Sequence, residues 1–361
     1  MNFYTLNTPL SFIWGERQRY NGMSIGIKEV AKEAGVSIAT VSRALNNEGY
    51  VSENAYKKVM EAAKRLNYEP NYLAQSLLKQ KTNIIGVVVS DIGTSFFSKI
   101  LKSIENCASE KGYSIMICNI EEDLEKEKKY LSVFKRMCVD GIILTNEQTD
   151  EELLAQLTAM SDIPMIACSC HINGGACASV NIDDYKAAYD AVSYLHRLGH
   201  RKIAYMGAGL HDFTVGRQRY EGVRAALIDK GCPIKDQYVW LSGLKIEHGY
   251  KMMKSLMKTC KDDLPTAIFA GSDDVAVGVM NCAFDFGYRV PEDFSILGFD
   301  NSEISASMRP AISTVHQPIE EIGYFSVSML VDLIEKDEQQ YSDLILPHKI
   351  IKRDSCTKKN P

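Results

Sequence analysis

Near its start the chain reads Val30-Ala-Lys-Glu-Ala-Gly-Val-Ser-Ile-Ala-Thr-Val-Ser-Arg-Ala-Leu-Asn46. This run predicts two short helices that meet at a tight turn, because apolar residues recur at helical spacing on both sides of Gly35. Gly35 can adopt the positive φ that ends a helix, and Ser37 is a good N-cap for the next one. In the second helix Val41, Ala44 and Leu45 form the inner face. The residues left to face outward are Ile38, Ala39, Ser42 and Arg43.

A third helix is predicted after Val51, with Ser52 as its cap and basic side chains on its outer face. Three helices of this size bury a small core. A helix-turn-helix that places its second helix in a DNA major groove is a known use of this arrangement. Taken alone, the pattern also fits a generic three-helix bundle with a solvated basic face.

The stretch from Asn67 to Thr82 favours the DNA-binding interpretation. Pro70 stops the preceding helix and can begin a new short one. Leu77 belongs to an apolar edge of that segment and lies close to Lys79 and Lys81. An apolar wedge flanked by lysines suits insertion into a minor groove with kinking of the duplex.

These residues resemble the head of the lactose-repressor (LacI/GalR) family of bacterial transcription regulators. The match runs nearly position for position from Val30 to Asn46 and continues in Asn67-Tyr-x-Pro-Asn71 and Ala74-x-x-Leu77. The resemblance implies a homodimer that reads a pseudo-palindromic double-stranded DNA operator. It implies base contacts from Ser37, Ile38, Ala39 and Arg43, phosphate contacts from Thr40, Ser42, Asn46, Tyr68 and Asn71, and a minor-groove wedge at Leu77.

The chemistry of the outward residues agrees with those roles. Arg43 can donate two hydrogen bonds to a guanine, a contact worth about 1–3 kcal/mol, whereas Ile38 and Ala39 offer apolar contact, for instance to a thymine methyl. We therefore expect Arg43 to specify a guanine and the pair Ile38 and Ala39 to select among related operators.

The charge of the chain is unevenly distributed. The 361 residues carry a net charge of −5, which on average argues against a nucleic-acid-binding protein. Residues 1–81, however, carry +4, and the remainder carries −9. The length, with 45% hydrophobic residues, predicts two or three domains, of which the first is basic and the rest acidic.

Several features indicate a cytoplasmic protein. Residues 1–22 hold one short apolar patch without the flanks of a signal peptide, and we expect them to be a disordered extension or a mis-assigned translation start. No apolar run is long enough to span a membrane. The ten cysteines are scattered without a C-x-x-C pair, which is typical of reduced thiols. The group Cys168, Cys170, His171 and Cys177 lacks a recognised zinc spacing, so we expect no metal site.

After Thr82, short apolar runs alternate with amphipathic segments, which is typical of parallel sheets covered by helices on both faces. The chain carries too many such units for one ordinary sheet. We therefore expect an α/β body of two Rossmann-like lobes, with a ligand cleft at the carboxyl ends of the strands. The expected strands are Ile84 to Val89, Tyr113 to Cys118, Gly141 to Thr145, Pro164 to Cys168, Ile203 to Gly207, Ala267 to Ala270 and Ser295 to Gly298.

The resemblance to the family continues through this region and implies the periplasmic-binding-protein fold, in which three crossovers join two lobes. Its signatures are Val180-Asn-Ile-Asp-Asp184, Gly199-His-Arg-Lys-Ile-Ala204, Gly298-Phe-Asp-Asn301 and Thr314-Val-His-Gln-Pro318. The expected domains are a helix-turn-helix head at 23–70, a hinge helix and linker at 71–82, and an effector-binding and dimerisation domain at 83–361. Lobe 1 is expected at about 83–183 and 317–345, and lobe 2 at about 184–313 and 346–361.

Candidate effector-binding residues lie where loops leave strand ends. Ser90 and Asp91 follow the first expected strand, and Phe96 lies just beyond them. A carboxylate near an aromatic face suits a sugar, because its hydroxyls need acceptors and its CH face needs an apolar plane. The resemblance places four further residues in the same pocket, namely Arg219, Ser272, Asp273 and Asp300.

Arg219 is open to two interpretations at this stage. Held between Asp273 and Asp300, it can present fixed donors to the hydroxyls or phosphate of a ligand. The same three residues can also form an ion-pair network that only stabilises the lobe.

No enzyme motif is present: the sequence has no G-x-S-x-G, phosphate loop, H-E-x-x-H or dinucleotide fingerprint. We therefore predict no catalysis and no cofactor. The sequence predicts a DNA-binding repressor whose operator affinity is controlled by a carbohydrate effector, a sugar or sugar phosphate, in the interlobe cleft. The alternative is a catabolite-control-type regulator with a phosphorylated carrier protein as corepressor, to which the segment from Asn301 to Pro310 is similar. A periplasmic sugar receptor and a Rossmann-type enzyme are opposed by the head and by the missing motifs.

Overall fold

The structure, a computed structural model, describes residues 26–46, 49–68, 81–148, 150–172, 177–336 and 342–359. The chain divides into two compact units, Met1–Gln80 and Lys81–Pro361. The expected extension at 1–22 and all but the last two residues of the expected hinge at 71–82 lie outside the described residues.

The described residues of the first unit form a head of three helices with a core of small and branched apolar residues. Val30, Val41 and Val59, one from each helix, are fully buried. Gly35 takes the predicted left-handed conformation, with φ +66°. The Oγ of Ser52 accepts the backbone N–H of Ala55 at 3.3 Å and so caps the third helix, as predicted. The helices are α1 (Ile27–Ala34), α2 (Ile38–Asn46) and α3 (Glu53–Arg65).

The second unit begins with a six-stranded sheet that is parallel throughout, in the order β11-β5-β4-β3-β1-β2. Strand β1 is apolar along its whole length, as a central strand covered on both faces must be. The elements of this first lobe are β1 (Ile84–Val89), α5 (Ser95–Glu110), β2 (Ser114–Asn119), α6 (Leu124–Met137), β3 (Gly141–Leu144), α7 (Glu151–Thr158), β4 (Met165–Cys168), β5 (Ala178–Ile182), α13 (Ile319–Lys336) and β11 (Leu344–Leu346).

The second lobe repeats the architecture with the sheet order β12-β10-β9-β8-β6-β7, in which β12 alone runs antiparallel to its neighbour. Its elements are α8 (Asp184–Arg197), β6 (Ile203–Ala208), the π-helix η1 (Phe213–Gln218), α9 (Arg219–Asp229), η2 (Asp236–Tyr238), β7 (Val239–Ser242), α10 (Ile246–Thr259), β8 (Ala267–Ala270), α11 (Asp273–Asp285), β9 (Ser295–Asp300), α12 (Glu303–Ser307), β10 (Ser313–His316) and β12 (Lys349–Ile351).

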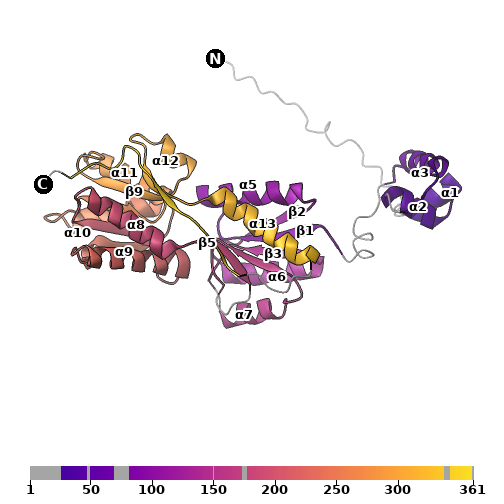
Figure 1. The fold of residues 1–361 in the computed structure, drawn as a ribbon, viewed down its shortest axis with the longest axis horizontal. Helices are drawn as coiled ribbons and strands as arrows, with labels where there is room; N and C mark the ends of the chain where they lie inside the picture. Colours follow the sequence, from indigo (N-terminus) through magenta and orange to yellow (C-terminus); the bar gives the residue numbers. More distant parts are fainter. Residues whose placement is uncertain are drawn as a thin grey trace, which may run out of the picture. The chain divides into compact units, whose positions relative to one another are not determined.

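The chain crosses between the lobes three times: from β5 to α8, from β10 to α13, and from β11 to β12. Helix α13, from the last part of the chain, therefore packs beside α5 of the first lobe (Figure 1). The predicted fold class, a helical head with a two-lobed α/β body, is confirmed.

All the expected strands are present, and the structure adds five that the apolar pattern missed: β5, β7, β10, β11 and β12. Strands β11 and β12 are three residues long and partly exposed. Strands β5 and β10 carry buried polar residues, among them Asn181 and Thr314. Within these five strands no apolar run is longer than three residues.

Candidate functional site

Helix α2 presents the predicted recognition surface. Ser37, Ile38, Ala39 and Arg43 are exposed, and 45% of Ile38 is accessible although it is a large apolar residue. An exposed isoleucine and an exposed arginine on the same helix offer a DNA major groove one apolar and one cationic contact. The other predicted contacts of this helix, Thr40, Ser42 and Asn46, are partly buried.

Local hydrogen bonds order the polar residues of this surface. Ser37 Oγ accepts the backbone N–H of Thr40 at 3.1 Å, which caps α2 as predicted, and lies 2.9 Å from Thr40 Oγ1. Asn46 Nδ2 donates to Ser42 Oγ at 3.4 Å. Tyr68 is half-buried against the helical core, and this burial raises its pKa. The predicted contacts Asn71 and Leu77 lie outside the described residues.

A cavity of about 390 Å³ lies between the two lobes of the body. Residues after β1, β2, β3 and β4 line it from the first lobe, and residues at the ends of β6, β7, β8 and β9 line it from the second. Ligands bind in this position, beyond the carboxyl ends of parallel strands, in open α/β folds. The predicted effector-binding residues that line the cavity are Ser90, Asp91, Phe96, Arg219, Ser272 and Asp300.

Polar contacts across the cleft tie the lobes together. Lys245 Nζ lies 2.6 Å from Asp91 Oδ2, and Ser95 Oγ donates to Asp274 Oδ1 at 2.9 Å. The ion pair holds the pKa of Asp91 below its usual value, against the opposing effect of burial. On the other side of the cavity Gln148 Nε2 donates to an Asp212 oxygen at 2.8 Å. A ligand that breaks these contacts, or forms hydrogen bonds with the same groups, changes the interactions that join the two lobes.

Arg219 is buried in the wall of the cavity, and it forms an ion pair with a carboxylate other than the expected Asp273 and Asp300. Its Nε donates to Asp184 Oδ1 at 2.6 Å, its Nη1 donates to the carbonyl of Gly271 at 2.6 Å, and its guanidinium stacks 3.7 Å from the ring centre of Phe299. Burial raises the pKa of Asp184, and Arg219 offsets part of that rise.

Asp273 does not line the cavity, in contrast to its predicted place in the pocket. It is fully buried. Its carboxylate accepts the N–H and hydroxyl of Ser302 and the hydroxyl of Thr314 at 2.6–2.9 Å. Asp273 thus joins the start of α11 to β10 and α12. Its neighbour Asp274 faces the cavity instead.

Asp300 does reach the cavity, from a strained backbone position. Its φ is +110°, and that of the next residue, Asn301, is +59°. Such conformations in non-glycine residues cost energy and cluster at ligand sites. The carboxylate accepts Gln317 Nε2 at 2.7 Å, and burial raises its pKa well above the usual value.

Three residues after β3 were missed by the sequence interpretation: Asn146, Glu147 and Gln148 line the cavity. Their position directly after an expected strand is the signal that could have found them. Glu147 Oε1 accepts the backbone N–H of Thr214 at 2.7 Å, from the opposite lobe. Lys245 was also missed, because it follows β7, a short strand that was not predicted and whose apolar run is three residues long.

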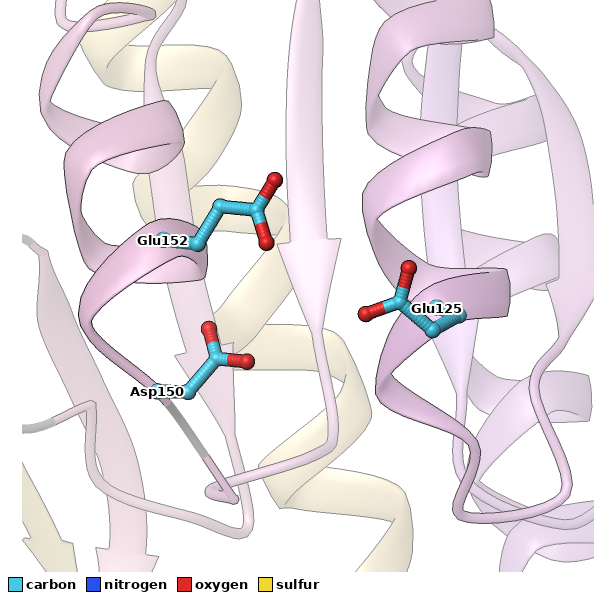
Figure 2. A group of neighbouring side chains, drawn as sticks. All are labelled: Glu125, Asp150 and Glu152. Carbon is cyan, nitrogen blue, oxygen red and sulfur yellow. The ribbon is translucent and has the colours of Figure 1, made fainter.

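An acidic group elsewhere in the first lobe has metal-ligand spacing but holds a lysine. The carboxylates of Glu125, Asp150 and Glu152 approach one another between the starts of α6 and α7 (Figure 2). The ammonium of Lys128 lies 2.7–2.8 Å from all three and has a raised pKa because of them. A metal ion would have to displace this ammonium.

The cysteine group around His171 has the character of packing. Both ring nitrogens of His171 lie 3.1 Å from hydrogen-bonding partners, Ser179 Oγ and Asn181 Nδ2. Burial raises the pKa of Cys168 and Cys177 to about 12, which disfavours the thiolate that binds metals.

Two family models match the chain. One, described as "Bacterial regulatory proteins, lacI family", matches residues 26–71, and the other, "Periplasmic binding protein-like domain", matches residues 192–356. The HTH-type transcriptional regulator RegA of Clostridium acetobutylicum is 39% identical over 337 residues, which are 92% of this chain and 100% of that protein. The chain belongs to the LacI family. It is a DNA-binding transcriptional regulator with a small-molecule-binding body.

Further relatives of this LacI-family regulator support the assignment. Catabolite control protein A of Priestia megaterium is 34% identical, over 92% of this chain and 99% of that protein. The lac repressor dimer bound to operator and the anti-inducer ONPF matches with TM-score 0.83 and 26% identity, over 93% of this chain and 100% of that one. A complex of the transcriptional regulator CelR with cellobiose matches with TM-score 0.70 and 26% identity, over 92% and 99%. In the part of the chain that the structure describes, no helix has the length and apolarity to cross a membrane.

Proposed function

We propose that this regulator binds a pseudo-palindromic operator as a homodimer and represses transcription in the cytoplasm. A carbohydrate in the cleft sets its operator affinity. The observation that carries the control by a ligand is the cavity, which both lobes line and which the ion pair Asp91–Lys245 spans. A ligand that prefers one lobe arrangement shifts the population toward it. Relatives whose names or structures report operators and sugars support the same reading.

The ligand contacts belong to the proposal as well. Ser90 and Asp91, from one loop, and Asp300, from another, offer acceptors to ligand hydroxyl groups. Ser272 lines the cavity from a third loop, and its hydroxyl donates to the carbonyl of Leu244 at 2.9 Å and accepts the N–H of Val275. Phe96 offers an apolar face to the ring of a sugar. Arg219, already held by Asp184, forms the back wall and presents its remaining N–H groups.

Operator reading is tested by selection of binding sites from random duplexes. Arg43→Ala should relax selectivity at one guanine position, at a cost of about 1–3 kcal/mol. The double variant Ile38→Ser, Ala39→Gln should change the preferred sequence. Lys57→Ala, on the exposed surface of α3 and paired with Glu53, is the control and should keep the preference. If both test variants kept the original sequence preference, α2 would not be the helix that reads the operator.

A second candidate function is regulation by a phosphorylated carrier protein. It is favoured by the relatives named catabolite control protein A. In the segment that suggested it, Arg309 Nη1 donates to three carbonyl groups of its own turn, at Ala306, Ser307 and Met308. These bonds compete with a phosphate for the guanidinium. A pull-down with phosphorylated and unphosphorylated carrier protein tests this function, and selective retention of the phosphorylated form would support it.

A further inference from the structure

The cavity is rich in carboxylates. Four of them, Asp91, Glu121, Glu122 and Glu147, come from the first lobe. Asp212, Asp274 and Asp300 come from the second lobe. Among the described lining residues the lysines and arginines are Lys245 and Arg219.

Both of these cations are already engaged by carboxylates. Lys245 pairs with Asp91 at 2.6 Å, and Arg219 pairs with the buried Asp184 at 2.6 Å. The two histidines of the lining also lie beside acidic groups: His211 Nε2 is 3.5 Å from Asp212, and His248 Nε2 is 3.9 Å from Glu247. A phosphate entering the cavity would therefore meet negative charge on both lobes and no unpaired lysine or arginine among the residues described there.

Glu147 is one of these carboxylates, and its surroundings favour a hydroxyl group over a phosphate. Glu147 is 8% exposed. Its Oε1 accepts the N–H of Thr214 at 2.7 Å, and its buried Oε2 has no hydrogen-bond partner. The hydroxyl of Thr214, also buried, has no partner either. A buried acceptor without a donor is costly. Because Glu147 and Thr214 belong to opposite lobes, a separation of the lobes would open both atoms to the cavity, and a ligand O–H group could then donate to Oε2.

Like charge in a buried site is screened weakly by salt and solvent. Burial raises the pKa of Glu147, and the charges of Asp212 and Asp184 raise it further, while the hydrogen bond from the Thr214 backbone opposes the rise. An anionic ligand group beside this carboxylate would add a further like charge. A ligand hydroxyl group that reached Oε2 of Glu147 would instead donate the hydrogen bond that this oxygen lacks. The same residue thus attracts one class of ligand group and rejects the other.

We propose that the cleft selects a polyhydroxylated ligand without a phosphate or carboxylate group, and that Glu147 is the residue that sets this selectivity. This inference rests on the proposed function and narrows its ligand class to neutral sugars and related polyols. Sugar phosphates are excluded.

Calorimetry on the full-length protein tests this with matched pairs: glucose and glucose 6-phosphate, fructose and fructose 6-phosphate, and trehalose and trehalose 6-phosphate. A neutral member should bind at least about tenfold tighter than its phosphate ester. Glu147→Gln, which keeps the shape and removes the charge, should reduce that ratio about tenfold. Glu105→Gln, on the exposed face of α5, is the matched control and should leave the ratio unchanged.

Tighter binding of a phosphate ester would overturn the inference, as would a ratio that Glu147→Gln does not change. Failure of every neutral member to bind would also overturn it. Operator affinity, measured on the same preparations, separates this from the proposed function: a phosphate ester that binds and alters operator affinity would refute the ligand class and leave the regulator intact.

Discussion

Arg219 shows how one residue of the cleft depends on a partner far away in the sequence. Its carboxylate partner, Asp184, lies at the first crossover, and its aromatic partner, Phe299, lies on β9. Both groups of the ion pair are almost completely buried. A carboxylate left behind without its arginine in such a place is strongly destabilising.

We therefore expect Arg219→Ala to lower the free energy of unfolding of the body by about 3–5 kcal/mol. Urea unfolding followed by circular dichroism measures this. Lys251→Ala, which breaks the exposed pair with Glu247, should cost less than about 1 kcal/mol. Equal, small effects of the two substitutions would show that Arg219 contributes ligand contacts alone.

Glu127 makes stability depend on pH. It is 1% exposed and accepts a hydrogen bond from Asn146 Nδ2 at 2.6 Å, and burial raises its pKa from 4.5 to about 7. The folded state therefore binds this proton more tightly than the unfolded state. The stabilising contribution is complete below about pH 4.5 and is lost as the pH rises through about 7.

The isosteric variant Glu127→Gln lacks this titration. Relative to it, the natural protein should lose up to about 3 kcal/mol of stability between pH 4.5 and 8. Thermal unfolding across that range measures the difference. Parallel pH profiles of the two proteins would contradict the buried, proton-binding state of Glu127.

At the scale of elements, the second lobe depends on the close approach of α10 and α11. Gly249 and Gly278 face the backbone of the opposite helix. A Cβ at residue 278 would lie 2.0 Å from the carbonyl oxygen of Ile246, and one at 249 would lie 2.2 Å from that of Val275. Neither contact can be relieved by a side-chain rotation.

Gly278→Ala should therefore push the two helices apart and cost about 1–3 kcal/mol. The midpoint of thermal unfolding should fall accordingly. Asn281→Ala, on the exposed side of the same helix, supplies the comparison and should have little effect. If the Gly278→Ala protein were as stable as this control, the two helices could move apart without any loss of stability.

The elements that sequence patterns predict are those with strong local signals. The head helices and the central strands have caps, turns or unbroken apolar runs, and all of them are present. The partner of Arg219 and the inward turn of Asp273 have no local signal, because each depends on residues brought close by the fold. Asp273 and Asp274 are adjacent on a helix and therefore point in different directions, and the local sequence does not tell which of them faces the cavity.

At the scale of the whole molecule, the two ends of the charge distribution serve different tasks. The basic first 81 residues include the surface of α2, and the acidic remainder includes the cleft. We expect the acidic charge of the body to disfavour nonspecific contact with DNA outside the head. The central claim is that a ligand in the body controls the affinity of the head for DNA.

The most direct test measures the affinity of the full-length protein for a selected operator by fluorescence anisotropy, with and without a saturating cleft ligand found by calorimetry. We predict a change in operator affinity of at least about tenfold, which is a coupling free energy of about 1.4 kcal/mol. Lys245→Met, which breaks the ion pair across the cleft, should bind the operator and alter the size of this change. Equal operator affinity in the absence and presence of bound ligand would contradict the account.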